Sequence, residues 1–160
     1  MEIAGQQAWT TRPTAYPVAT ITNYGKGKIA GFYMDMSNAY NQFRSPIFNQ
    51  LIRNLVNSLV PDPLVSVTGS NKIHVVLGKK DGRTFIHLIN SSGEHFNKSI
   101  LSYSELLSTG SLQIRYKSSA RPTSIKLQPS GQTINFKYSD NRIEFEIPPV
   151  EVHSIVEIEL

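Results

Sequence analysis

Four glutamates are the nearest this sequence comes to paired catalytic carboxylates. Glu144 and Glu146 are two positions apart, and so are Glu157 and Glu159, in segments where polar and apolar residues alternate. Glycoside hydrolysis needs two carboxyl groups about 5 to 10 Å apart across a bond, one of them with a raised pKa. Side chains two apart on a strand point the same way. We therefore interpret both pairs as solvated strand faces and predict no catalytic residue.

The histidines and the absence of cysteine likewise give no catalytic or metal-binding motif. The chain has no cysteine, which excludes disulfides, thiolate nucleophiles and cysteine zinc sites. The histidines are too widely spaced for a zinc motif, at His74, His87, His95 and His153. His87 alternates with Phe85 and Ile89, which indicates a half-buried strand histidine. We predict neither a metal nor a cofactor.

The elements that would position such residues begin with a hairpin. Residues 1–15 are polar and unpatterned, contain the single tryptophan, Trp9, and predict an extended lead-in. Residues 16–23 and 28–34 are strand-like and flank a short glycine turn, which predicts an antiparallel hairpin. A polar loop is expected over residues 35–44.

A helix is predicted from Pro46 to Leu59, with Ser45 as N-cap and Pro61 beyond its end. Its apolar residues recur at helical spacing, at Ile47, Phe48, Leu51, Ile52, Leu55, Val56 and Leu59. A two-stranded hairpin is too small to cover this stripe. We therefore expect interface packing by Ile47, Phe48, Leu51, Ile52 and Leu55, either against upstream domains of the same polypeptide or against a second copy through the 45–59 helix.

From Leu64 onward apolar residues recur at every second position, as in β-strands. The expected strands are 64–67, 72–79, 83–90, 112–117, 123–127, 133–138, 142–147 and 153–159. A helical turn is expected at 102–107, where Ser102 and Glu105 have capping-box spacing. The predicted fold is mainly β: an antiparallel sandwich at 61–160, preceded at 16–60 by a hairpin and one helix of a partial α/β domain.

Composition narrows the function classes. The 160 residues carry a net charge of +4, but the basic residues are scattered, so we expect no nucleic-acid partner. No run of about 18 apolar residues occurs, which argues against a membrane span. An apolar fraction of 39% fits a globular domain with a core of its own.

Several stretches together resemble a known family. They are a glycine turn leading to Phe32-Tyr33-Met34-Asp35, a loop containing Tyr40, the apolar helix, Pro61-Asp62-Pro63-Leu64 and Phe85-Ile86-His87-Leu88-Ile89-Asn90. This order resembles the C-terminal region of a group of glycoside hydrolases. In those proteins a catalytic barrel precedes a β-galactosidase-trimerisation-like domain, of class I glutamine-amidotransferase-like fold, and a β-sandwich follows.

The resemblance implies a non-catalytic accessory region of a carbohydrate-active enzyme, because the family's catalytic carboxylates lie in the upstream barrel. Residues 16–59 would be the tail of the amidotransferase-like domain and residues 64–160 the sandwich. It also implies a periplasmic or secreted location. Two alternatives stay open: an independent carbohydrate-binding sandwich, which needs an exposed aromatic platform, and a small self-contained enzyme, which needs two converging ionisable groups.

Overall fold

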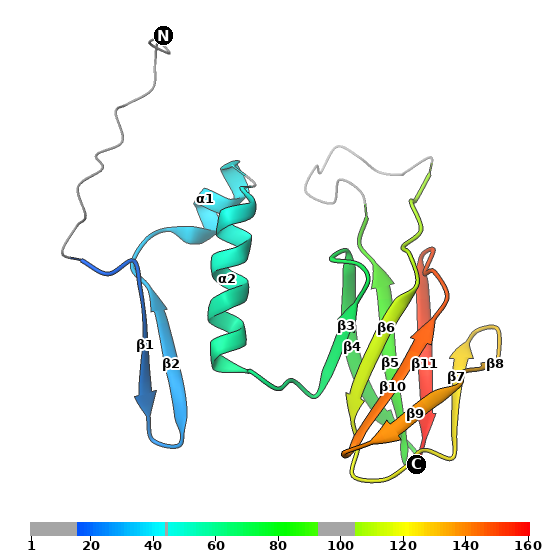
Figure 1. The fold of residues 1–160 in the computed structure, drawn as a ribbon. Coiled ribbons are helices and arrows are strands. Elements are labelled where there is room, and N and C mark those ends of the chain that lie inside the picture. Colours follow the sequence, from blue (N-terminus) through cyan, green and yellow to red (C-terminus); the bar gives the residue numbers. More distant parts are fainter. Residues whose placement is uncertain (1–15, 44, 93–104) are drawn as a thin grey trace. The chain divides into compact units, whose positions relative to one another are not determined.

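A computed structural model of the protein describes residues 16–43, 45–92 and 105–160 (Figure 1). The chain divides into two compact units, Met1–Asp62 and Pro63–Leu160. The division falls within the Pro61-Asp62-Pro63 sequence, where the predicted period changes from helix to strand.

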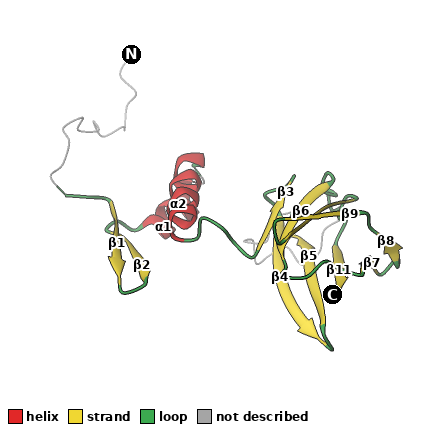
Figure 2. Cartoon of the chain, turned by 60° about the horizontal axis from the view of Figure 1, so that its bottom comes forward, coloured by secondary structure: helices red, strands yellow, loops and turns green. Residues whose placement is uncertain are grey.

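The first unit contains a two-stranded ribbon and two helices. Strands β1 (Ala19–Tyr24) and β2 (Gly27–Phe32) pair antiparallel, from Ala19 opposite Phe32 to Tyr24 opposite Gly27. Helix α1 (Met36–Phe43) is followed by α2 (Pro46–Leu59), which contacts both α1 and β2. Figure 2 shows the two helices, coloured red, side by side. The predicted hairpin and the predicted long helix are therefore both present.

The expected loop over residues 35–44 is wrong, because α1 occupies most of it. Asp35 caps this helix: its Oδ1 accepts a hydrogen bond from the backbone N–H of Asn38 at 3.1 Å. Gln42 Nε2 donates to Asn38 Oδ1 one turn earlier, at 3.2 Å. Among the side chains of this helix whose burial is described, Met36 is the single buried apolar one, and its mostly polar composition hid the helix from a search for apolar periodicity.

The second unit is an antiparallel β-sandwich, which confirms the predicted fold class. One sheet has the order β3-β6-β10-β9, formed by Val65–Thr68, Leu112–Lys117, Arg142–Ile147 and Phe136–Ser139. The other has the order β4-β5-β11-β7-β8, formed by Ile73–Lys80, Arg83–Asn90, His153–Glu159, Ser124–Gln128 and Gln132–Thr133.

The single strand predicted at 133–138 is two strands in different sheets. β8 pairs with β7 in the five-stranded sheet, whereas β9 pairs with β10 in the four-stranded sheet. Ile134 is buried, Phe136 packs against the core, and Asn135 between them is exposed. Because the inward and outward alternation continues through the crossing, the sequence pattern could not reveal it.

The core lies between the two sheets and is built mostly from alternate residues of their strands, with Ile134 and Val150 added from the connections. Its buried members are Ile86, Leu88, Leu112, Ile114, Tyr116, Ile125, Leu127, Ile134, Ile143, Phe145, Ile147, Val150, Val156 and Ile158. At one end of this core, the side-chain amide of Asn90 contacts three backbone carbonyl groups. Asn90 Nδ2 lies 2.8, 3.3 and 2.7 Å from the carbonyl oxygens of Leu107, Val150 and Glu151. These contacts satisfy a polar group that would otherwise be costly to bury.

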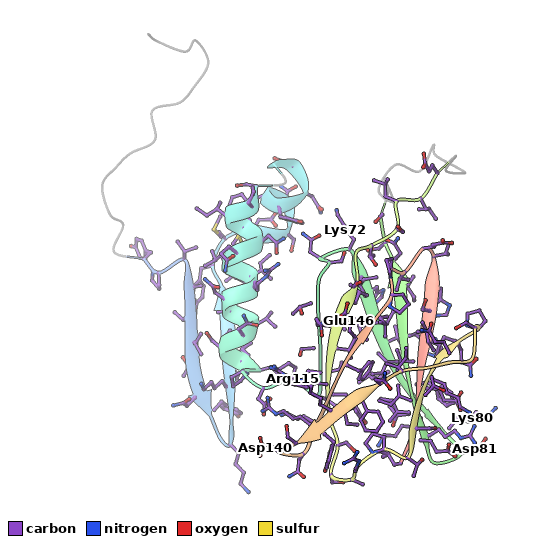
Figure 3. The ribbon with its side chains drawn as sticks, turned by 45° about the vertical axis from the view of Figure 1, so that its right-hand side comes forward. Lys72, Lys80, Asp81, Arg115, Asp140 and Glu146 are labelled. Atoms are coloured by element: carbon purple, nitrogen blue, oxygen red, sulfur yellow. The ribbon has the colours of Figure 1, made fainter. Side chains whose placement is uncertain are left out.

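Tight turns fix the strand registers. The turn between β4 and β5, labelled at Lys80 and Asp81 in Figure 3, has positive φ at Asp81 (51°) and Gly82 (78°). Positive φ at both central positions matches the right-handed twist of a hairpin. At Gly69 a glycine is required for a steric reason, because a Cβ there would lie 2.4 Å from the Ser111 carbonyl oxygen. Its backbone therefore admits no side chain.

We predict that stability depends on the sandwich core and hardly on α2. Ile143→Ala removes a fully buried side chain and should lower the free energy of unfolding by roughly 2–5 kcal/mol. Ile47→Ala, the same chemical change at a side chain that is 70% exposed, should change it by less than about 0.5 kcal/mol. Urea denaturation followed by circular dichroism, at a dilution where the chain is monomeric, measures both. Equal losses for the two variants would contradict the assignment of the core.

Candidate functional site

The α2 helix lacks a fully buried side chain. Among the five predicted packing residues, Phe48, Ile52 and Leu55 are half-buried, in a helix that contacts α1 and β2. Ile47 and Leu51, one turn apart, are 70% and 36% exposed. Val56 is 51% exposed. The first unit therefore leaves part of the apolar stripe of α2 uncovered, and packing of these residues against a partner stays a prediction.

The hairpin beside α2 is also apolar and exposed. On one face, Ile29, Tyr24 and Tyr33 are all exposed, and Tyr33 is fixed by a 3.0 Å hydrogen bond between its hydroxyl and Thr20 Oγ1. Lys28, on the other face, donates from Nζ to the Ser58 carbonyl oxygen near the end of α2, at 3.5 Å. The ribbon thus carries its helix on one side and a bare apolar surface on the other.

In the described part of the first unit, Met36 is the single buried apolar side chain, at 5% exposure. The sandwich buries fourteen in its core cluster. Soluble monomers rarely expose contiguous apolar patches of large area, and such patches mark interaction surfaces. We call the exposed apolar side chains of this unit, taken together from both faces of the ribbon, α2 and the adjoining segments, the uncovered face; they are Tyr16, Val18, Ile21, Tyr24, Ile29, Tyr33, Met34, Ile47, Leu51, Val56 and Val60.

The outer face of the four-stranded sheet carries the first glutamate pair. Arg115 Nε donates to Glu144 Oε1 at 2.7 Å, and Gln113 Nε2 donates to Glu146 Oε2 at 2.6 Å. Both glutamates are exposed and border an open depression of about 390 Å³; Figure 3 labels Arg115 and Glu146. Each carboxylate is occupied by its cross-strand neighbour. This arrangement is that of a solvated strand face.

The second glutamate pair lies on the outer face of the five-stranded sheet. Arg83 donates to Glu157 at 2.7 Å and to Glu159 at 3.3 Å, and Gln128 Nε2 donates to Glu157 at 2.9 Å. The hydrogen bond from Gln128 and then the contacts with Arg83 lower the pKa of Glu157 below its ordinary value. A general acid needs the opposite shift. The ionised form stabilises the fold above the unfolded-state pKa, and this contribution disappears as the pH falls through the lower folded-state pKa.

Three histidines, by contrast, gather on one face. His74 and His153 both lie opposite Ile89, on the two strands that flank β5, and His87 is two residues from Ile89. His87 is half-buried, as predicted, and its Nδ1 is 3.2 Å from His153 Nε2. This juxtaposition could not be found from sequence, because His87 and His153 are separated by 66 positions.

Sugar-binding surfaces commonly present an exposed aromatic ring. In the described part of the sandwich, Phe85, Phe136 and Tyr138 are half-buried, and Tyr116 and Phe145 are buried. The turn expected at 102–107 lies largely outside the described residues, as do Tyr103, His95 and Trp9; residues 105–107 are not helical. The aromatic rings named here from the described sandwich therefore do not form the exposed platform that the carbohydrate-binding alternative needs.

The described helices are all too short to cross a membrane. Within the same residues, no three histidine or carboxylate side chains are grouped so as to hold a metal ion.

No family model and no curated protein sequence matches this sequence. The fold is similar to that of alpha-L-fucosidase isoenzyme 2 from Paenibacillus thiaminolyticus, with a TM-score of 0.77 and 16% sequence identity. The match covers 98% of this chain and 24% of the fucosidase chain. It establishes a shared fold, and this chain spans about a quarter of the length of that enzyme.

The uncovered face predicts concentration-dependent self-association of the isolated chain, through Ile47 and Leu51 of α2. Leu51→Glu should shift the mass measured by light scattering toward the monomer, because a charge in an apolar interface costs free energy. Asn57→Glu adds the same charge at an exposed position that was polar already, and should leave the mass unchanged.

A chain that is strictly monomeric at every concentration would contradict self-association through this face. So would a dimer that both glutamate variants leave intact.

Proposed function

We propose that this chain is a non-catalytic accessory region, C-terminal in its parent protein, of a carbohydrate-active enzyme of the glycoside hydrolase type. The observation that carries the proposal is the likeness to an alpha-L-fucosidase across nearly the whole chain. Both units contribute to that likeness, since it covers 98% of the residues. The role of the region is to supply packing surface to the larger enzyme.

The uncovered face supports this role. Among its described residues this unit buries one apolar side chain and exposes eleven on two strands, one helix and the adjoining segments, which is the composition of an incomplete domain. We propose that its missing partner is the preceding part of the same polypeptide, with α2 and the β1–β2 ribbon as the last elements of an α/β domain. The proposed partner must also cover the ribbon. The face of the ribbon that carries the exposed Ile29 and Tyr33 needs a covering layer, because the sheets of α/β domains are covered on both faces.

The chemistry of the exposed carboxylates also favours an accessory role. Glu144 and Glu157 are both held by arginine, at 2.7 Å in each case. For Glu157 these contacts favour the ionised form, and the general acid of a glycosidase must carry a proton. In this proposal catalysis therefore belongs to another part of the parent enzyme.

The isolated chain should not hydrolyse a panel of chromogenic 4-nitrophenyl glycosides that includes the α-L-fucoside. We expect release of 4-nitrophenol at the buffer rate, measured by absorbance over several days at high protein concentration. Glu144→Gln and Glu146→Gln are the matched controls, since they border the depression on the four-stranded sheet. Turnover by the native chain that either variant abolishes would overturn the non-catalytic assignment.

A further inference from the structure

The outer face of the five-stranded sheet differs from that of the four-stranded sheet. On the four-stranded sheet, Arg115 and Gln113 pair with Glu144 and Glu146 in a polar surface. On the five-stranded sheet, the end of β5 carries His87 and Ile89, flanked by His153 of β11. Because Ile86 and Leu88 are fully buried, the alternate residues His87 and Ile89 point outward.

Register brings two of these imidazoles into contact. His87 lies opposite Ile155 and His153 opposite Ile89, so the two histidines are diagonal neighbours on adjacent antiparallel strands. Their rings are nearly parallel, at 11°, and His87 Nδ1 lies 3.2 Å from His153 Nε2. Both strands are held in place by the core, which fixes the backbone positions of the two side chains.

The separation of the two nitrogens is that of ligands on one metal ion. Two imidazole nitrogens bound to a tetrahedral Zn²⁺ at about 2.0–2.1 Å lie about 3.3–3.4 Å apart. For a cis pair in a square-planar ion the same bond length gives about 2.8–3.0 Å. The 3.2 Å between His87 and His153 falls between these values.

We propose that His87 and His153 form a two-imidazole site for a divalent transition-metal ion such as Zn²⁺ or Cu²⁺. In the metal-free pair one ring donates an N–H and the other accepts it. Binding requires the donor ring to move its proton to its second nitrogen, and each ring to turn until both lone pairs meet at one point. The tautomer change leaves the charge of both rings unchanged, and His153 is exposed and free to turn.

The remaining coordination positions are open. The described residues place no third histidine or carboxylate within reach of a shared ion. His74 lies on the far side of β5 from His153, and Arg83 with Glu157 is further along the sheet. Water would complete the shell, so the site should be weaker than a closed structural zinc site and should prefer Cu²⁺ over Zn²⁺.

Titration calorimetry of the tag-free chain with Zn²⁺, and in separate titrations with Cu²⁺ and Mg²⁺, tests the proposal. We expect one ion per chain, tighter binding of Cu²⁺ and no heat from Mg²⁺, which prefers oxygen ligands. His87→Gln and His153→Gln should each weaken Zn²⁺ binding at least about tenfold, since losing a ligand costs no less than losing an outer-shell partner. His74→Gln, on the same face but outside the pair, should leave the affinity unchanged.

Two results would overturn the site: no Zn²⁺ binding by the folded chain at millimolar concentration, or an affinity that both pair variants retain. An equal loss in His74→Gln would also contradict a two-ligand site. His153→Gln alters an exposed side chain, so it remains informative if His87→Gln disturbs the half-buried strand position. Circular dichroism of each variant establishes that it is folded.

Discussion

Burial of apolar side chains between two sheets is the interaction on which this structure depends. In the sandwich, every second residue of β5, β6 and β10 is buried and the apolar ones join one core, whereas the residues between them are half-buried or exposed. The first unit lacks such an arrangement, since Met36 is its single buried apolar side chain among the described residues. One part of the chain therefore carries its own stabilising core, whereas the other carries apolar surface and very little interior.

This imbalance connects the fold to the proposed function. Conformational entropy opposes the ordering of every residue, and burial must offset it. The ribbon and α2 bury little within their own unit, so their stability calls for a surface outside it. The accessory role proposed above would meet that requirement, because the preceding part of a longer polypeptide would supply the missing surface. The His87–His153 pair is independent of this connection, because it is positioned by the sandwich alone.

Elements with a strong period were predictable from sequence. The helix at Pro46–Leu59 and the strands at Arg83–Asn90, Leu112–Lys117, Arg142–Ile147 and His153–Glu159 have the expected bounds. Helix α1 was missed because its polar residues form caps and side-chain hydrogen bonds in place of an apolar stripe. The split between β8 and β9 was missed because a crossing between sheets preserves the alternation.

Of the two candidate sites, one could be predicted from the sequence and the other could not. Exposure along α2 followed from the shortage of covering elements, which is visible in the sequence. The pairing of His87 with His153 depends on the order of strands in the sheet, which places β11 next to β5. Strand order is set by the whole core and not by local pattern, so no motif spacing could have indicated the pair.

Amide hydrogen exchange of the isolated chain, at a dilution where it is monomeric, tests the central claim most directly. Protection reports the free energy of local opening, which depends on buried contacts. Amides of β5, β6, β10 and β11 should exchange slowly and together, whereas those of β1, β2 and α2 should exchange orders of magnitude faster. Protection of α2 equal to that of β10 would contradict the account, because it would mean that the first unit is stable without a partner.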